Sequence, residues 1–127
     1  MMIIGLGIDI VEIDRIKEAI DRNNKFLDRV FTENEIIYFK SKNFHSNTIA
    51  GNFAAKEAIS KAFGTGIRNF NLKDIEILRN ELGKPVVNVY NNLYELSKNL
   101  NVGNIMVSIS HSKNYAVANA IITKEEI

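Results

Sequence analysis

The sequence predicts an α+β fold in which helices pack against an antiparallel sheet. The first observation is the order of patterns: a strand pattern comes first, helical patterns follow as far as Gly64, and mostly strand patterns fill the rest. The second is the length, because 127 residues fit one domain, residues 1–127, and leave little room for two. The third is that 46% of the residues are hydrophobic, which is enough to build a core and argues against a disordered chain.

Residues 3–11 form the first predicted strand because β-branched residues are frequent and the two faces alternate. One face carries Gly5, Gly7 and Asp9, which leaves space for a metal ion or a phosphate to approach the carboxylate. The other face is apolar and consists of Ile4, Leu6, Ile8 and Ile10. The two glycines suggest a dinucleotide fingerprint, but its third glycine is missing, so we reject that interpretation. The plainer alternative for Asp9 is that it ends the strand and caps the next helix.

Residues 12–30 show a helical pattern that Asn23 and Asn24 could break into two pieces. One stripe of this helix is apolar and consists of Ile13, Ile16, Ile20, Leu27 and Val30. On a continuous helix, a second stripe turned away from it would hold Arg15, Arg22 and Arg29, with Phe26 beside them. This stripe is either a solvated face or a docking surface for an acidic helical partner, in which arginines flank an exposed phenylalanine.

Thr32 and Glu35 form a capping box that opens a short helix through about Ser41. After a loop, Asn47 or Thr48 is expected to cap a longer helix that ends at Gly64. The many alanines of this helix predict that it packs tightly against another element.

The remainder of the chain is predicted to be mostly strands. The expected elements are strands at 74–78 and 85–90 around a turn at 80–84, a short helix at 92–100, and strands at 105–110 and 115–123 around residues 111–114. Pro85, the only proline, suits the first residue of its strand.

Charge and composition exclude several classes of protein. Sixteen basic and fifteen acidic residues argue against a nucleic-acid binder that works by bulk charge. No cysteine is present, which excludes disulfides, thiolate nucleophiles and the usual structural zinc sites. The start of the chain lacks the basic segment of a signal peptide, and the longest stretch free of Asp, Glu, Lys and Arg, 99–112, is too short for a membrane span. We therefore expect a cytoplasmic protein with no membrane partner.

The strongest local signal lies in residues 53–62 of the alanine-rich helix. Phe53, Glu57 and Lys61 recur every four residues and so share one face. Such a pair is usually solvated, but this helix is too apolar to be exposed, and a buried glutamate needs a partner such as a metal ion. Asp9 and Glu57 together would suit Mg²⁺, provided that the substrate is itself a phosphate ester. Lys61 and the turn at 64–66 would then meet its phosphates.

His111 lies at the end of a predicted strand, beside serines. It could bind a phosphate or accept a proton near neutral pH, although a hydrogen-bonded turn residue is the more common role of such a histidine. His45 is given no functional role.

Three blocks of the sequence resemble bacterial holo-acyl-carrier-protein synthases, which are phosphopantetheinyl transferases. The blocks are GLGIDIVEIDRI near the start, FAAKEAISKAFGTG in the middle and VSISHS near the end, with Gly83-Lys84-Pro85 between the last two. The resemblance covers nearly the whole chain in the right order.

The resemblance implies a magnesium-dependent enzyme that moves the phosphopantetheine arm of coenzyme A onto a serine of apo acyl carrier protein and releases adenosine 3′,5′-bisphosphate, in support of fatty acid biosynthesis. It implies that Asp9 and Glu57 hold the metal and that Lys61, Gly64, Pro85 and His111 contact coenzyme A. It further implies a homotrimer with the active site at the subunit interface.

The resemblance also implies that a carrier-docking helix begins at Arg15 and carries Lys25. The arginine stripe adds Arg22, Phe26 and Arg29 to this expected docking surface. Lys25 stands where other members have arginine, so the charge is kept while the forked guanidinium is not. Glu57 and Lys61 assist the chemistry, and the base is open between Glu57, acting through a water, and His111. The alternative function is a non-catalytic module that binds coenzyme A or the carrier protein.

Overall fold

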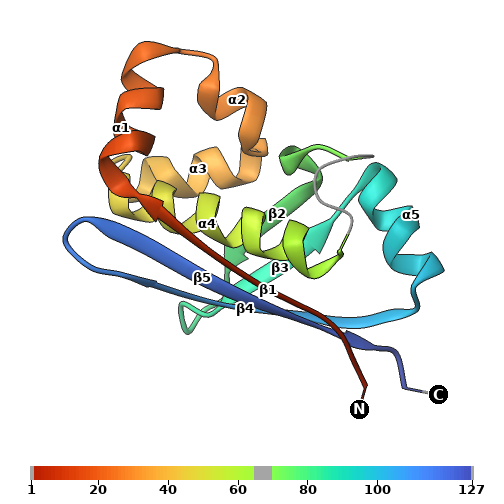
Figure 1. The fold of residues 1–127 in the computed structure, drawn as a ribbon. Helices are drawn as coiled ribbons and strands as arrows, with labels where there is room; N and C mark the ends of the chain where they lie inside the picture. The colour runs from red at the N-terminus through yellow and green to blue at the C-terminus, as the bar shows by residue number, and fades with distance from the viewer. Residues whose placement is uncertain (1, 65–69, 127) are drawn as a thin grey trace.

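Two antiparallel sheets form the framework of the structure (Figure 1). The larger sheet has the order β1-β5-β4 and consists of β1 (Ile3–Glu12), β5 (Tyr115–Lys124) and β4 (Val102–His111). The smaller sheet pairs β2 (Ile75–Arg79) with β3 (Pro85–Val89). The predicted α+β class is confirmed, and the strands expected in one sheet are divided between two.

The computed structural model describes residues 2–64 and 70–126. The helices are α1 (Ile13–Arg22), α2 (Phe26–Val30), α3 (Glu33–Ser41), α4 (Ser46–Ala62) and α5 (Asn91–Asn99), and η1 (Leu72–Asp74) is a 3₁₀ turn. α4 lies across one face of the larger sheet, and no helix of the described residues covers the opposite face (Figure 1). None of these helices is long and apolar enough to cross a membrane.

The helix α4 and the strand β1 approach each other closely, and glycines on β1 make this possible. A Cβ atom placed on Gly5 would lie 1.9 Å from the carbonyl oxygen of Ala62, and one on Gly7 would lie 1.9 Å from that of Ala58. The tight packing predicted from the alanines is therefore confirmed. The expectation that this glycine face leaves open space is wrong, because the backbone of α4 fills it.

The predicted helix over residues 12–30 is broken at Asn23 and Asn24, where the sequence allowed a break. α1 ends at Arg22, the Lys25 backbone N–H donates to Asn23 Oδ1 at 3.0 Å, and α2 begins at Phe26. The seven-residue spacing of Arg15, Arg22 and Arg29 consequently does not fall on one continuous helix, although all three side chains are exposed.

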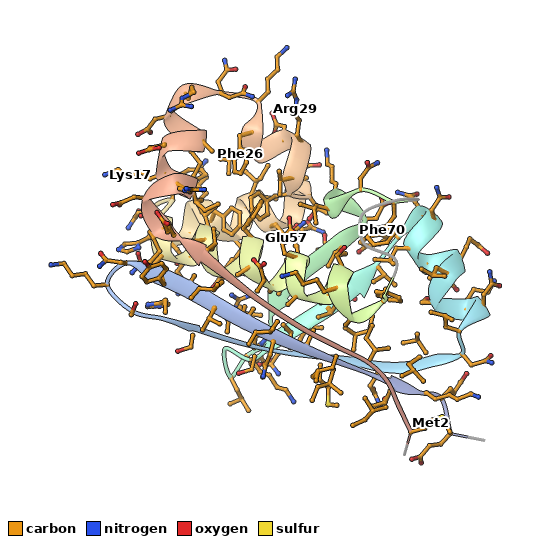
Figure 2. All side chains as sticks on the ribbon, viewed as in Figure 1. Met2, Lys17, Phe26, Arg29, Glu57 and Phe70 are labelled. Atoms are coloured by element: carbon orange, nitrogen blue, oxygen red, sulfur yellow. The ribbon has the colours of Figure 1, made fainter. Side chains whose placement is uncertain are left out.

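Phe26 is half-buried, so its expected exposure is wrong. Its ring centroid lies 6.4 Å from that of Phe31 and 6.2 Å from that of Phe53. Because α2 starts afresh after the break, its first residue can turn inward into this aromatic cluster, where burial of a large ring is favourable. Figure 2 shows Phe26 among the helices, whereas Lys17 and Arg29 point outward.

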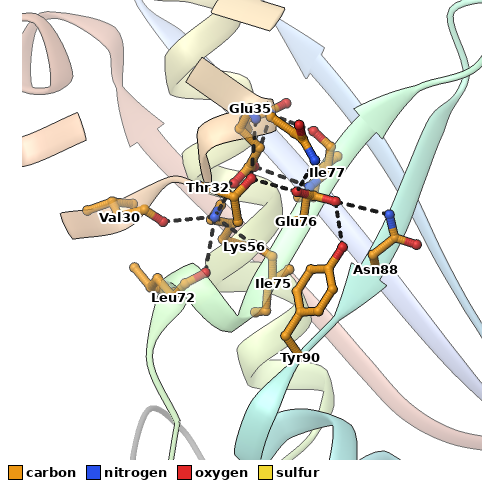
Figure 3. Close-up of polar contacts among 12 residues, drawn as sticks. Val30, Thr32, Glu35, Lys56, Leu72, Ile75, Glu76, Ile77, Asn88 and Tyr90 are labelled. Carbon is orange, nitrogen blue, oxygen red and sulfur yellow. Dashed lines mark hydrogen bonds and ion pairs between the residues drawn. The ribbon is translucent and has the colours of Figure 1, made fainter. Parts of the chain in front are cut away.

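The capping box of α3 is confirmed and belongs to a larger buried network (Figure 3). The Glu35 carboxylate lies 2.6 Å from the Lys56 ammonium, and both side chains are fully buried. The ammonium also donates to the carbonyl oxygens of Val30, Leu72 and Ile75 at 2.8, 3.1 and 2.6 Å. Burial raises the pKa of Glu35 and lowers that of Lys56. The attraction between the two charges acts in the opposite direction on both pKa values but does not outweigh burial. The pair joins α3 and α4 to the segments that follow residue 70.

Glu76 forms a second centre of this network. Its carboxylate accepts hydrogen bonds from Thr32, Asn34, Asn88 and Tyr90. Burial acts to raise the pKa of Glu76, but these hydrogen bonds together hold it below its usual value. They attach the start of α3 to the smaller sheet.

Candidate functional site

Asp9 and Lys61 meet where β1 passes the end of α4. The Lys61 Nζ atom lies 3.0 Å from Asp9 Oδ1 and also donates to the Ile8 carbonyl oxygen at 3.0 Å. The Asp9 side chain is 17% exposed and the Lys61 side chain 54%. Asp9 points to this side because it shares the strand face of the two glycines, and α4 can come near only because those glycines are bare.

Glu57 completes the cluster from one turn earlier on α4. Figure 2 places it on this helix, above β1 in the view. Burial raises the pKa of Glu57, the nearby charge of Asp9 raises it further, and Lys61 partly offsets both effects. The structure thus brings together the three residues that the sequence singled out, with two carboxylates that repel each other.

The donor set of this cluster fits a divalent cation. Carboxylate oxygens are the ligands that Mg²⁺ prefers. One carboxylate of the cluster, Asp9, is already paired with a positive charge, the Lys61 ammonium. Within residues 2–64 and 70–126, no group of three or more His, Cys, Asp and Glu side chains could hold a metal. Two protein ligands leave most of the coordination of Mg²⁺ to water and to a phosphorylated substrate.

Pro85 and His111 lie in a different place, a pocket of about 480 Å³ beside the start of α4. Arg79, Lys84 and Tyr38 also line this pocket, and the Arg79 guanidinium lies 5.1 Å from the Tyr38 ring centroid. The pocket therefore combines cations with an aromatic ring, as a site for a phosphorylated nucleotide does.

Sequence reasoning missed two features of this region. Arg79 is held by a hydrogen bond of 2.8 Å to Asn52 Oδ1, a contact across 27 residues that leaves no local pattern. The cap of α4 is His45, whose Nδ1 accepts from the Asn47 N–H at 3.3 Å, and not Asn47 or Thr48. Histidine is not one of the residue types that usually cap a helix, so the sequence held no clear signal for this cap.

The helix α4 separates the two clusters within one chain. Gly51, in the pocket, faces Ile109 of β4, whereas Ala58 and Ala62 face β1. Ten residues of helix separate Gly51 from Lys61, which corresponds to about 15 Å. The structure therefore unites Asp9, Glu57 and Lys61, and separately Pro85 and His111, but does not join the two groups.

Gly64 follows α4 with φ of +78°, a backbone conformation that favours glycine, and its N–H donates to the Lys61 carbonyl oxygen. The other two members of the expected turn, Thr65 and Gly66, lie outside the described residues. The expected docking residues Arg15, Arg22, Lys25 and Arg29 are exposed on α1, α2 and the link between them.

The domain thus holds two carboxylates beside an ammonium and, separately, a cationic pocket. This combination is typical of a protein that handles phosphate esters with a metal ion. Comparison with known proteins makes this specific. Residues 5–120 match the 4′-phosphopantetheinyl transferase superfamily. The holo-[acyl-carrier-protein] synthase of Clostridium beijerinckii is 61% identical over 121 residues, which cover 95% of this chain and 98% of the relative.

Solved structures agree. The holo-[acyl-carrier-protein] synthase of Neisseria meningitidis superposes with a TM-score of 0.90 at 32% identity, covering 97% of this chain and 100% of that one. The Bacillus anthracis enzyme in complex with CoA (3′,5′-ADP) has a TM-score of 0.81 at 38% identity, covering 98% and 99%. The chain belongs to the holo-[acyl-carrier-protein] synthase family of the 4′-phosphopantetheinyl transferase superfamily.

Proposed function

We propose that this chain transfers the phosphopantetheine arm of coenzyme A to a serine of apo acyl carrier protein. The observation that carries the proposal is the convergence of Asp9, Glu57 and Lys61 in a member of this family. The serine oxygen forms a bond to the phosphorus next to pantetheine, and the bond from that phosphorus to the bridging oxygen of the diphosphate breaks. The products are holo acyl carrier protein and adenosine 3′,5′-bisphosphate, and the serine proton passes to a base.

Asp9 and Glu57 would hold Mg²⁺. When bound, the metal would neutralise charge on the diphosphate and on the transferring phosphoryl group. Lys61 adds a positive charge beside the same phosphates, which stabilises negative charge as it develops on the leaving oxygen. The raised pKa of Glu57 supports its role as a metal ligand, because its ionised form is unfavourable alone and a bound cation would stabilise it.

Coenzyme A would place its nucleotide in the pocket that holds Pro85 and His111. Arg79 and Lys84 supply positive charge for phosphate there, and the Tyr38 ring supplies an apolar wall. The Helicobacter pylori holo-[acyl-carrier-protein] synthase, 36% identical to this chain, has been solved in complex with coenzyme A.

A complete site would need a second copy of the chain, in a homotrimer. The separation of the two clusters by α4 supports this, since the nucleotide pocket of one copy can serve the carboxylates of the next. The uncovered face of the larger sheet also supports it: Leu6, Ile8 and Ile10 are 70%, 63% and 64% exposed. In that arrangement His111 of a neighbouring copy and Glu57 remain the two candidates for the base.

The exposed cations of α1 and α2 would bind the acidic carrier protein. We expect Arg15→Ala to raise the Michaelis constant for the carrier about threefold to tenfold at low salt, with less effect as the salt concentration rises. Steady-state assays across a range of KCl would measure this, with Lys98→Ala on the distant helix α5 as control. An unchanged Michaelis constant and an unchanged salt dependence would contradict the docking role.

Mass spectrometry tests the transfer itself. Apo carrier protein incubated with this protein, coenzyme A and Mg²⁺ should gain the mass of one phosphopantetheine arm, and omission of Mg²⁺ should prevent the gain. Binding of coenzyme A or carrier without any gain in mass would instead favour the non-catalytic module. Activity in the cytoplasm, in support of fatty acid biosynthesis, is part of the same proposal.

A further inference from the structure

The Lys61 ammonium is paired with Asp9, one of the two carboxylates proposed to hold the metal. It lies 3.0 Å from Asp9 Oδ1 and 3.0 Å from the Ile8 carbonyl oxygen, so two acceptors on β1 hold it at once. The Asp9 side chain is 17% exposed, so the carboxylate is partly buried. In the proposed function, the same lysine serves the phosphates of coenzyme A.

The Lys61 ammonium cannot stay on Asp9 and at the same time serve the phosphates beside a metal held by Asp9. A divalent cation and an ammonium repel each other strongly at such short range. The ammonium already binds one oxygen of the carboxylate that the metal would need. The Lys61 side chain is 54% exposed and carries its charge on a flexible four-carbon stem, so it is able to swing away. A diphosphate beside the cluster would offer the departing ammonium a new anionic partner.

We propose that Lys61 acts as an internal cation that holds Asp9 until the diphosphate of coenzyme A arrives. The ammonium weakens binding of the metal alone, and its transfer to the diphosphate frees the carboxylate. Metal and coenzyme A therefore bind cooperatively, and each raises the affinity for the other by the same factor. This inference rests on the proposed metal and substrate sites and adds the coupling between them.

Binding of Mn²⁺ measured by electron paramagnetic resonance tests the inference without any turnover. In the absence of coenzyme A, we expect Lys61→Gln to bind Mn²⁺ about fivefold more tightly than the wild type. The difference should persist in 0.5 M KCl, because a direct contact with a partly buried carboxylate is screened less than the field of an exposed charge. Lys73→Gln, which removes an exposed lysine of η1, is the matched control and should change binding less than about twofold.

Coenzyme A provides the second arm of the experiment. Its addition should tighten Mn²⁺ binding in the wild type by a factor at least about fivefold larger than in Lys61→Gln. Asp9→Asn reports whether the metal occupies the assigned site and should weaken Mn²⁺ binding in both arms.

The outcomes separate the inference from the function on which it rests. If Mn²⁺ binding requires Asp9 but is equal in the wild type and Lys61→Gln, or if coenzyme A tightens it by equal factors, the inference is wrong while the proposed function stands. Mn²⁺ binding that does not depend on Asp9 overturns both. If Lys61→Gln binds Mn²⁺ more tightly only at low salt, the effect comes from the long-range charge of Lys61. The proposed direct contact with Asp9 would then be wrong.

Discussion

The Glu57→Gln variant is expected to lose transfer activity by at least about a thousandfold at saturating Mg²⁺. The carboxamide has almost the same shape as the carboxylate but no charge, so it would remove one of the two proposed protein ligands of the metal. With only Asp9 left, the cluster cannot attract a divalent cation against the Lys61 ammonium. Rates from mass spectrometry of the carrier protein, over a series of Mg²⁺ concentrations, measure the effect.

The same substitution should leave the fold intact. The pKa of Glu57 is raised by burial and by Asp9, so its ionised form is less favourable in the folded state than in the unfolded chain. At neutral pH the charge therefore costs stability, and the neutral glutamine should leave the midpoint of urea unfolding unchanged or slightly higher. A loss of activity accompanied by equal or greater stability would show that Glu57 serves the reaction and not the fold.

A matched control is available on the surface. Glu95→Gln removes an exposed carboxylate of α5 and should keep the wild-type rate. If Glu57→Gln turned over as fast as this control at saturating Mg²⁺, the assignment of Glu57 to the metal site would be lost.

Local patterns predicted most of the elements and the meeting of Asp9, Glu57 and Lys61. The alternation along β1 and the four-residue spacing of Glu57 and Lys61 each place a side chain on a defined face. Once the alanines of α4 are packed against the glycines of β1, those faces must meet. This is why the sequence pattern alone could join Asp9 to Glu57, although 48 positions separate them.

Long-range contacts account for what could not be predicted. Asn23 and Asn24 marked where the helix could break, but the inward turn of Phe26 depends on its contacts with Phe31 and Phe53. Arg79 enters the pocket through Asn52, which is remote in sequence. In the sequence, Lys56 resembles any other lysine of a helix, since its four acceptors lie in two distant stretches, residues 30–35 and 72–75.

Lys56→Met is expected to destabilise the protein by about 3–5 kcal/mol, a large part of the usual free energy of unfolding. Methionine fills a similar volume but leaves the fully buried Glu35 carboxylate without its partner at 2.6 Å. It also removes the donor to the carbonyl oxygens of Val30, Leu72 and Ile75. Urea unfolding followed by far-ultraviolet circular dichroism measures the loss, with Lys73→Met as a control that should change stability by less than about 0.5 kcal/mol.

A double variant separates the buried charge from the lost packing. Lys56→Met combined with Glu35→Gln removes both charges, while the glutamine carbonyl can still accept from the Ile77 backbone N–H that Glu35 now binds at 3.2 Å. Because an unpaired buried charge costs more than a neutral polar pair, the double variant should recover at least about half of the stability lost by Lys56→Met. If Lys56→Met does not fold, recovery of a folded protein in the double variant still tests the argument. A double variant no more stable than Lys56→Met would show that the three carbonyl contacts, and not the ion pair, hold α4 in place.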